Sequence, residues 1–411
     1  MPALVRLRKC IYGLKQAANA WRKHLHDSLV SLGFHACVSD SCVYIKVLSD
    51  GSIIQLATHV DDVLIIASSQ SLIQWFVDSM SVIYQIKVQN PLTSYLGMNI
   101  SCDPSAKTLT LNQPAYIQDL ADKYASSISS EFPVTPMLPA PPEDPTPLTE
   151  AEQCLYMSKI GSLLYLAMHS RPDIQLAVSM CSQYMKAATV GHMGAVNRIL
   201  SYVVGTPHLG ITFHGGQGTT LMATVDSSYG NHPDRRSQYG ITLHLGTLDS
   251  GTVYSVSRKS KCVSLSSTEA EYIALCEAAK LIAWARQFLQ EIQCEQLEPT
   301  TVFEDNQSTI RMVCNGNDRG RTKHVDIRYH YVRQLLADGV IDVQYLPTID
   351  MLADILTKPL PSSQYLYLRD KLLGLSGVST TGIFASGVEL ERDSGSSISR
   401  DLSPPRLRAV D

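Results

Sequence analysis

Residues 265–292 read LSSTEAEYIALCEAAKLIAWARQFLQEI, and the prediction for the second half of the chain starts from this stretch. A polar start is followed by apolar residues at helical spacing, which form one stripe: Ala274, Ala278, Leu281, Ala285, Phe288 and Ile292. This period predicts a long helix over 268–292 with one face buried. A helix of this kind needs a partner surface, and the flanking sequence predicts a sheet.

Apolar runs that read as strands lie on both sides of this helix. The strands before it are at 221–225, 239–245 and 253–265. The elements after it are a strand at 301–304, a helix, a basic helix at 324–337, a strand at 340–345 and a helix from about 349. Antiparallel strands followed by alternating helices and strands predict a five-stranded mixed sheet with helices on both faces.

Four carboxylates fall at the junctions of these elements. Asp226 and Asp305 each follow an apolar strand, Glu271 lies in the first turn of the long helix, and Asp354 lies in the last helix. Adjacent parallel strands would place Asp226 and Asp305 side by side at the edge where open sheets bind ligands. A converging set of acids would hold two hard divalent cations, and paired metals cleave phosphodiester bonds.

Each acid also has an ordinary structural interpretation. Thr268 to Glu271 match a capping box, in which Glu271 only returns to the backbone of Thr268. Asp305 is suited to cap the helix after it, and Asp226 to a turn. Asp354 is suited to a solvated helix face. The residues alone leave these alternatives open.

Bulk composition narrows the class of protein. The 411 residues carry 45% hydrophobic and 18% charged residues and a net charge of −4. Two or three globular domains are expected, and any binding of nucleic acid must come from local basic patches. The ten cysteines show no zinc-ligand spacing, which suits a reducing compartment. No targeting signal or membrane-spanning run is recognised.

The second half resembles the ribonuclease H domain of copia-type LTR retrotransposon Pol polyproteins. The resemblance is carried by 225–229 (VDSSY), 265–272 (LSSTEAEY), 304–308 (EDNQS), 322–330 (TKHVDIRYH) and 353–359 (ADILTKP). It implies a Mg²⁺-dependent endonuclease that cuts the RNA strand of RNA–DNA hybrids with two ions. By position, Asp226, Glu271 and Asp305 match the three core acids and Asp354 the fourth; Glu269 is the competitor for Glu271.

This resemblance also implies which residues contact nucleic acid. At some positions, however, the sequence departs from the pattern of the family. Arg321, Lys323, His324 and Arg328 are the expected hybrid contacts, although an ordinary solvated basic face explains them equally well. Many relatives carry a second acid where Ser228 stands. Cellular ribonucleases H carry a histidine shortly before the fourth acid, and residues 346–348 contain none. The roles of His324 and His330 stay open.

The first half resembles the reverse transcriptase of the same Pol polyproteins. His59-Val60-Asp61-Asp62 between apolar strands resembles the metal-binding hairpin, and the upstream run 11–17 (IYGLKQA) resembles a motif beneath nucleotide and template. The resemblance implies metal binding by Asp61 and Asp62, and template contacts by Lys15 and Gln16. The strand with the first catalytic Asp is expected before residue 1, so we expect no polymerase activity from this chain.

Together these patterns predict an α+β partial polymerase palm and thumb, followed by an α/β ribonuclease H-like domain. The expected segments are truncated reverse transcriptase (1–125), Pro-rich linker or strap (126–150), helical connection (151–217), ribonuclease H-like domain (218–360) and disordered tail (361–411).

The expected partners are an RNA–DNA hybrid, template RNA and other retrotransposon Pol or Gag products, in a cytoplasmic virus-like particle or the nucleus and away from membranes. The alternatives are a decayed remnant without activity, and a cellular ribonuclease H with an extra domain; residues 1–125 disfavour the latter.

Overall fold

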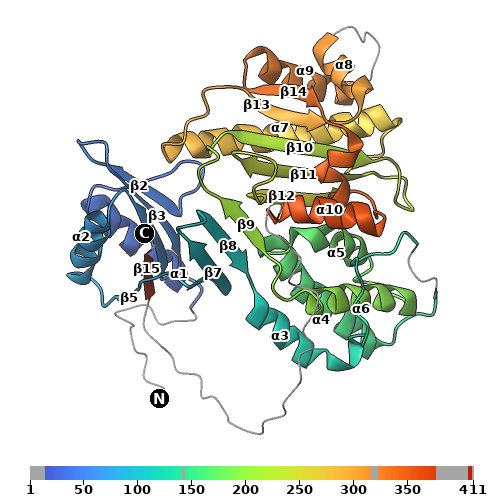
Figure 1. Cartoon of the computed structure of the whole chain (residues 1–411), viewed down its shortest axis with the longest axis horizontal. Coiled ribbons are helices and arrows are strands. Elements are labelled where there is room, and N and C mark those ends of the chain that lie inside the picture. The colour runs from blue at the N-terminus through green and yellow to red at the C-terminus, as the bar shows by residue number, and fades with distance from the viewer. Residues whose placement is uncertain (1–13, 141–143, 316–322, 376–405, 410–411) are drawn as a thin grey trace, which may run out of the picture. The chain divides into compact units, whose positions relative to one another are not determined.

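The computed structural model describes residues 14–140, 144–315, 323–375 and 406–409 (Figure 1). The chain forms two compact units. The first comprises Met1–Tyr95, Gln287–Glu295 and Gly382–Asp411, and the second comprises Leu96–Arg286 and Gln296–Thr381. Within the described residues, no helix is long and apolar enough to cross a membrane.

The first unit is a sheet with two helices, α1 (Ala17–Ser31) and α2 (Gln70–Ser81). Its strands follow the order β1-β2-β3-β4-β15-β5. Their bounds are β1 His35–Ala36, β2 Val43–Val47, β3 Ile53–His59, β4 Asp62–Ala67, β5 Lys87–Gln89 and β15 Arg406–Ala409. Alternate residues such as Ile54 and Leu56 point into the core, where they meet Leu29 and Phe76 from the helices. The two strands predicted on either side of His59 to Asp62 are therefore confirmed: β3 and β4 pair as a hairpin in this sheet.

The second unit begins with antiparallel strands and helices. After β6 (Ser94–Tyr95), β7, β8 and β9 pair antiparallel in that order. The elements are β7 Met98–Asp103, β8 Thr108–Asn112, α3 Pro114–Lys123, η1 Ala125–Ser127, α4 Glu150–His169, η2 Pro172–Ile174, α5 Gln175–Ser182, α6 Val190–Val204 and β9 Ile211–His214. The predicted helical connection (151–217) is helical as far as Val204 and then contains the strand β9. A capping box at Thr149 and Glu152 starts α4.

The same unit continues into a five-stranded mixed sheet of order β12-β11-β10-β13-β14. β10 pairs antiparallel with β11 and parallel with β13, which itself runs parallel to β14. The elements are β10 Leu221–Ser228, β11 Gln238–Leu245, β12 Tyr254–Lys259, α7 Ser267–Glu291, β13 Thr300–Glu304, α8 Gln307–Asn315, α9 Lys323–Ala337 and β14 Ile341–Tyr345. Figure 1 shows α7 running along this sheet and α5 beside its β12 edge. The predicted mixed sheet is confirmed.

The C-terminal part of this unit differs from expectation. Asp354 lies in a 3₁₀ turn, η4 (Leu352–Leu356), after a second such turn, η3 (Thr348–Asp350), and not in a regular helix. The expected disordered tail begins with a helix, α10 (Ser362–Leu372). Tyr365, Leu368 and Leu372 bury one side of α10 in the core of the helical segment, which offsets the cost of ordering a weakly apolar stretch. Residues 376–405 lie outside the described residues.

The predicted boundaries at 125/126, 150/151 and 217/218 all fall inside the second unit, so they do not separate compact units. The Pro-rich segment acts as a strap on the helices. Arg198 donates to the hydroxyl of Thr135 at 3.2 Å, and the backbone amide of Leu148 donates to the carbonyl of Ala188. Of the two interpretations of this segment, the structure supports the strap.

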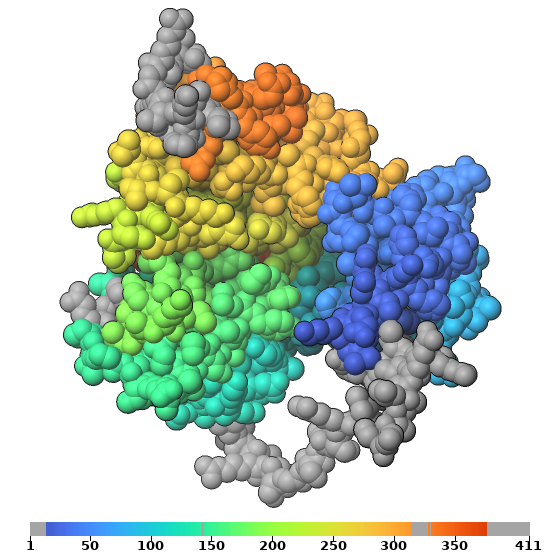
Figure 2. All heavy atoms as spheres, turned by 180° about the vertical axis from the view of Figure 1, so that it is seen from behind, coloured from blue at the N-terminus to red at the C-terminus, as the bar shows by residue number. Residues whose placement is uncertain are grey.

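A buried ion pair joins the helical segment to α10. Arg171 donates two hydrogen bonds to the carboxylate of Asp173 at 2.9 Å each, and both side chains are fully buried. The hydroxyl of Tyr202 donates to the same carboxylate at 2.7 Å, and Tyr365 of α10 donates to the carbonyl of Asp173. Figure 2 shows the green surface of the helical segment directly against the yellow-green surface of the sheet segment. The turn η4 and the helix α10 also pack into the same core as these helices.

We expect Arg171→Met to destabilise the chain by about 3–5 kcal/mol, because it leaves the Asp173 carboxylate buried without its charge partner. Arg236→Ala is the matched control, since its pair with Asp234 is exposed; it is expected to change stability by less than about 0.5 kcal/mol. Thermal and urea unfolding measure both. Similar effects of the two variants would contradict the structural role of the buried pair.

Candidate metal centre

Three of the four predicted acids meet in one place. Asp226 of β10, Glu271 of α7 and Asp305, the residue after β13, each offer a carboxylate oxygen, and these oxygens all lie within 4.8 Å of one another. Asp226 and Glu271 are buried, and Asp305 is half-buried. It is the one such group of potential ligands found among the described residues.

Strand pairing explains why the two aspartates meet. β10 and β13 run parallel with Thr224 opposite Phe303, so the register carried on by two residues places Asp226 beside Asp305. Neighbouring parallel strands end at the same edge of the sheet, which is where the predicted site was expected. The adjacency of Asp226 and Asp305 is therefore confirmed, whereas their catalytic role stays a prediction.

Hydrogen bonds at the start of α7 give Glu269 and Glu271 different roles. Ser266 accepts a hydrogen bond from the backbone of Glu269 at 3.2 Å, and the Glu269 carboxylate accepts from the backbone of Leu265 at 2.7 Å. Glu269 therefore holds the start of α7, in the manner of a capping box. The buried Oε2 of Glu271 has no hydrogen-bond partner and faces the other acids.

The other ordinary interpretations also fail. Asn306, not Asp305, caps α8, because its side chain accepts from the backbone of Ser308 at 3.0 Å and from that of Thr309 at 3.1 Å. Asp226 lies within β10 opposite Gly240, so it is not a turn residue. Asp354 is only 2% exposed, so it is not a solvated helix acid.

Asp354 adjoins the cluster through a lysine. Its Oδ1 lies 2.9 Å from the ammonium of Lys358, which lies 3.8 Å from Oδ1 of Asp226. Gly240 allows this approach, since a Cβ there would lie 2.7 Å from the Cβ of Leu356. The hydroxyl of Thr357 donates to Oδ2 of Asp226, which orients that carboxylate from the same 3₁₀ turn.

Burial and mutual repulsion raise the proton affinity of these acids. Burial, reinforced by the neighbouring carboxylates, raises the pKa of Glu271 well above its usual range. Burial and the carboxylate of Asp226 raise the pKa of Asp354 to about 8. Burial opposes the charge of Lys358, but Asp226 and Asp354 outweigh it and raise the pKa of the lysine.

Glu304, the last residue of β13, was not singled out in the sequence. It is fully buried; its Oε1 accepts from the backbone of Asn306 at 2.9 Å, and its Oε2 has no partner. Its charge raises the pKa of Glu271. Glu304 could have been recognised from the alternation of the strand. Thr300, Val302 and Glu304 share its buried face, so the strand places an acid toward the core.

These side chains fit hard divalent cations. All potential ligand atoms are carboxylate oxygens, the ligand type that Mg²⁺ prefers. The buried Oε2 atoms of Glu271 and Glu304 have no hydrogen-bond partner, and a bound cation would compensate their charge. Thr348 donates to Oδ2 of Asp305 at 2.7 Å and so orients a third carboxylate.

The predicted nucleic-acid contacts have mixed outcomes. Lys15 and Gln16 are exposed at the start of α1. Arg328 is half-buried on α9 and donates to the sulfur of Cys262 at 3.6 Å, so it serves the packing of α9. Arg321 lies outside the described residues. Lys323 and His324 lie on the first turn of α9, where the structure does not describe side chains.

The hairpin acids of the first unit form no comparable group. Asp61 is exposed and Asp62 half-buried at the turn between β3 and β4, and Trp21 of α1 donates to the carbonyl of Val60 at 2.5 Å. Val60 adopts φ of 54°, a conformation that costs energy for a β-branched residue. Among the described residues, no third acid lies close enough to Asp61 and Asp62 to form a group that could hold a metal ion.

The raised pKa values predict how stability depends on pH without metal. Burial raises the pKa of Asp354 in the folded chain to about 8, whereas an unfolded aspartate has a pKa of about 4. Folding is therefore weakened as pH rises from about 4 to 8, by an amount on the order of 1 kcal/mol or more. In the presence of a chelator, we expect the melting temperature of Asp354→Asn to rise relative to that of wild type as the pH is raised from 5 to 8.

Melting curves at closely spaced pH values measure this difference, and added Mg²⁺ is expected to shrink it, because a cation replaces the proton as the stabilising partner. A constant difference between the two proteins over this range would refute the raised pKa of Asp354.

Comparison with known proteins agrees with the resemblance drawn from the sequence. Residues 2–139 match the family described as Reverse transcriptase (RNA-dependent DNA polymerase). The Pol polyprotein from transposon RE1 of Arabidopsis thaliana is 34% identical over 372 residues, covering 89% of this chain and 25% of that protein. That from transposon TNT 1-94 of Nicotiana tabacum is 33% identical, covering 88% of this chain and 27% of that protein.

The chain thus spans about a quarter of the length of these curated relatives. Among solved structures, the foamy viral protease-reverse transcriptase in complex with an RNA/DNA hybrid is 12% identical, with a TM-score of 0.44 over 85% of this chain and 40% of that one. The RNase H1 of Halobacterium salinarum is 20% identical, with a TM-score of 0.26 over 34% of this chain and 94% of that one. Most of this chain is therefore similar in sequence to about a quarter of the Pol polyproteins of copia-type retrotransposons.

Proposed function

We propose that the second unit is a Mg²⁺-dependent ribonuclease H that cleaves the RNA strand of an RNA–DNA hybrid. The observation that carries this proposal is the group formed by Asp226, Glu271 and Asp305, with Asp354 attached to it through Lys358. A proposed pair of cations, held by these carboxylates, would supply an activated water and a counter-charge for the leaving oxygen.

The chain's own residues prepare the site for that chemistry. Thr357 donates to Oδ2 of Asp226 and Thr348 to Oδ2 of Asp305, and these bonds orient the two carboxylates. Orientation by such outer contacts keeps ligands in place without a cation. Burial of Asp226 and Glu271 excludes water and so strengthens the electrostatic interactions at the reacting phosphate.

A basic surface at the same end of the sheet is suited to hold the backbone of the hybrid. β12 ends opposite the start of β11, which pairs with the end of β10 just after Asp226. The chain at this end of the sheet carries five cationic residues, Arg235, Arg236, Arg258, Lys259 and Lys261, and the acid Asp234, which pairs with Arg236 and Lys259. Hybrids are recognised by shape and phosphate contacts, and such a patch needs no base-reading side chains.

The nuclease assignment is tested with a labelled RNA–DNA hybrid and the full chain. We expect Mg²⁺-dependent cleavage of the RNA strand, and a loss of about 100-fold or more in Asp305→Asn, since one ligand of the cations is removed. Asp338→Asn is the matched control, because this exposed acid bonds only to Gln334, and it should cut as wild type does.

Cleavage that is equal in Asp305→Asn and wild type would reject the proposed site. Arg258→Ala should weaken hybrid binding and reduce its dependence on salt, without changing the requirement for Mg²⁺.

The alternative is a remnant that binds nucleic acid without cutting it. Lys358 favours this candidate, because its ammonium lies between Asp226 and Asp354, where a cation would be needed. Hybrid binding without turnover at any Mg²⁺ concentration would establish that alternative.

For the first unit, we propose that Asp61 and Asp62 do not support polymerisation by this chain. Two-metal nucleotidyl transfer needs acids from more than one strand, and the described residues supply no third acid beside this pair. In a primer-extension assay with Mg²⁺ and deoxynucleotides, we expect no extension above that of an Asp61→Asn, Asp62→Asn control. Mg²⁺-dependent extension that the double variant abolishes would overturn this.

A further inference from the structure

The acid cluster has two halves that share Asp226. One half, with Glu271 and Asp305, brings its carboxylate oxygens within 4.8 Å of one another, and Oε2 of Glu271 has no hydrogen-bond partner. The other half, with Asp354, holds the ammonium of Lys358 at 2.9 Å from Asp354 and 3.8 Å from Asp226. The chain therefore supplies one cation to one half of its own site.

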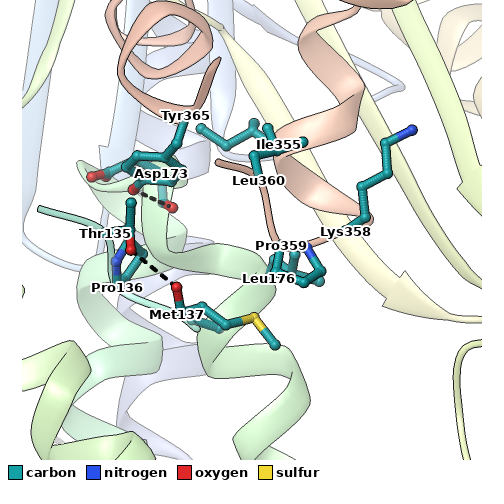
Figure 3. A pocket seen from close by; sticks show the side chains of 11 residues that line it. Thr135, Pro136, Met137, Asp173, Leu176, Ile355, Lys358, Pro359, Leu360 and Tyr365 are labelled. Carbon is teal, nitrogen blue, oxygen red and sulfur yellow. Dashed lines mark hydrogen bonds between the residues drawn. The ribbon is translucent and has the colours of Figure 1, made fainter. Parts of the chain in front are cut away.

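The ammonium is held in this position by the fold. The backbone amide of Lys358 donates to the carbonyl of Asp354 at 3.2 Å, so the lysine lies one short turn beyond its partner. Its stem lines a small pocket with Pro359 and Leu360, and Figure 3 shows the ammonium directed away from Asp173 and Met137 on the other side of that pocket. The side chain is 36% exposed, so its ammonium has a path to solvent.

Two cations cannot share the same space between Asp226 and Asp354. A divalent ion bound by Asp226, Glu271 and Asp305 leaves Lys358 where it is. A divalent ion bound by Asp226 and Asp354 must displace an ammonium that already pairs with both. Displacement costs the two ion pairs, which are stronger in a partly buried site than in water.

We propose that Lys358 is an internal cation that occupies the second metal position, so that the free chain binds one divalent ion tightly and the second only by displacing the lysine. The inference rests on the proposed two-metal function. A scissile phosphate that arrives at the site offers Lys358 an alternative anionic partner, and the second ion then enters. The lysine thereby couples complete metal loading to the presence of substrate.

The test is calorimetric titration of the full chain with Mn²⁺, without nucleic acid. In wild type we expect one tight ion and a second that binds about tenfold or more weakly. Lys358→Met should tighten the second ion by about tenfold and leave the first unchanged, and Lys358→Arg, which keeps the charge, should resemble wild type. Lys280→Met, which removes an exposed lysine of α7 paired with Glu277, is the matched control.

If Lys358→Met does not fold without metal, Lys358→Gln keeps the hydrogen-bonding capacity and takes its place. Unchanged isotherms in the charge-removing variants, two equal ions in wild type, or no bound ion in wild type would each overturn the inference. Because no hybrid is present in the titration, its result does not depend on whether the chain cleaves a hybrid. A tightened second ion in a chain that never cuts hybrid would uphold the internal cation and reject the nuclease.

Discussion

The crowding of buried acids at one edge of the mixed sheet is the constraint to which the surrounding structure responds. Parallel pairing of β10 and β13 brings Asp226 beside Asp305, and α7 adds Glu271 from the adjoining layer. Like charges that lie this close together and are shielded from water repel one another strongly. Lys358, two threonine hydroxyls and a raised affinity for protons reduce that repulsion in the chain alone.

That response extends beyond the sheet. The 3₁₀ turn that carries Asp354 packs over β10 and β11, and α10 follows it into the core of the helical segment. There Tyr365 bonds to the buried pair of Arg171 and Asp173. The segment that completes the acid site is thus held by helices far away in the sequence. The helical segment, the five-stranded sheet and the proline-rich strap accordingly belong to one compact unit.

Periodicity and motif spacing predicted the mixed sheet, the long helix and the acids that meet. These features depend on alternation, helical spacing and strand order, which are local or follow from simple topology. Glu304 and Lys358 were quoted within motifs but not recognised as part of the site. Their importance depends on the direction in which each side chain points and on the groups that face it, which the sequence does not show.

The sequence by itself determined that residues 221–345 form a mixed sheet with acids at its carboxyl edge, because strand period and connection rules act within short stretches. The motif resemblance favoured Glu271 over Glu269 by position, but the residues alone did not distinguish an acid that binds cations from one that caps a helix. Only the tertiary structure identified the capping residues, by assigning Glu269 and Asn306 to the helix starts and burying Glu271 among other carboxylates. A cap is satisfied by its own backbone, whereas a metal centre needs charges brought together from distant parts of the chain.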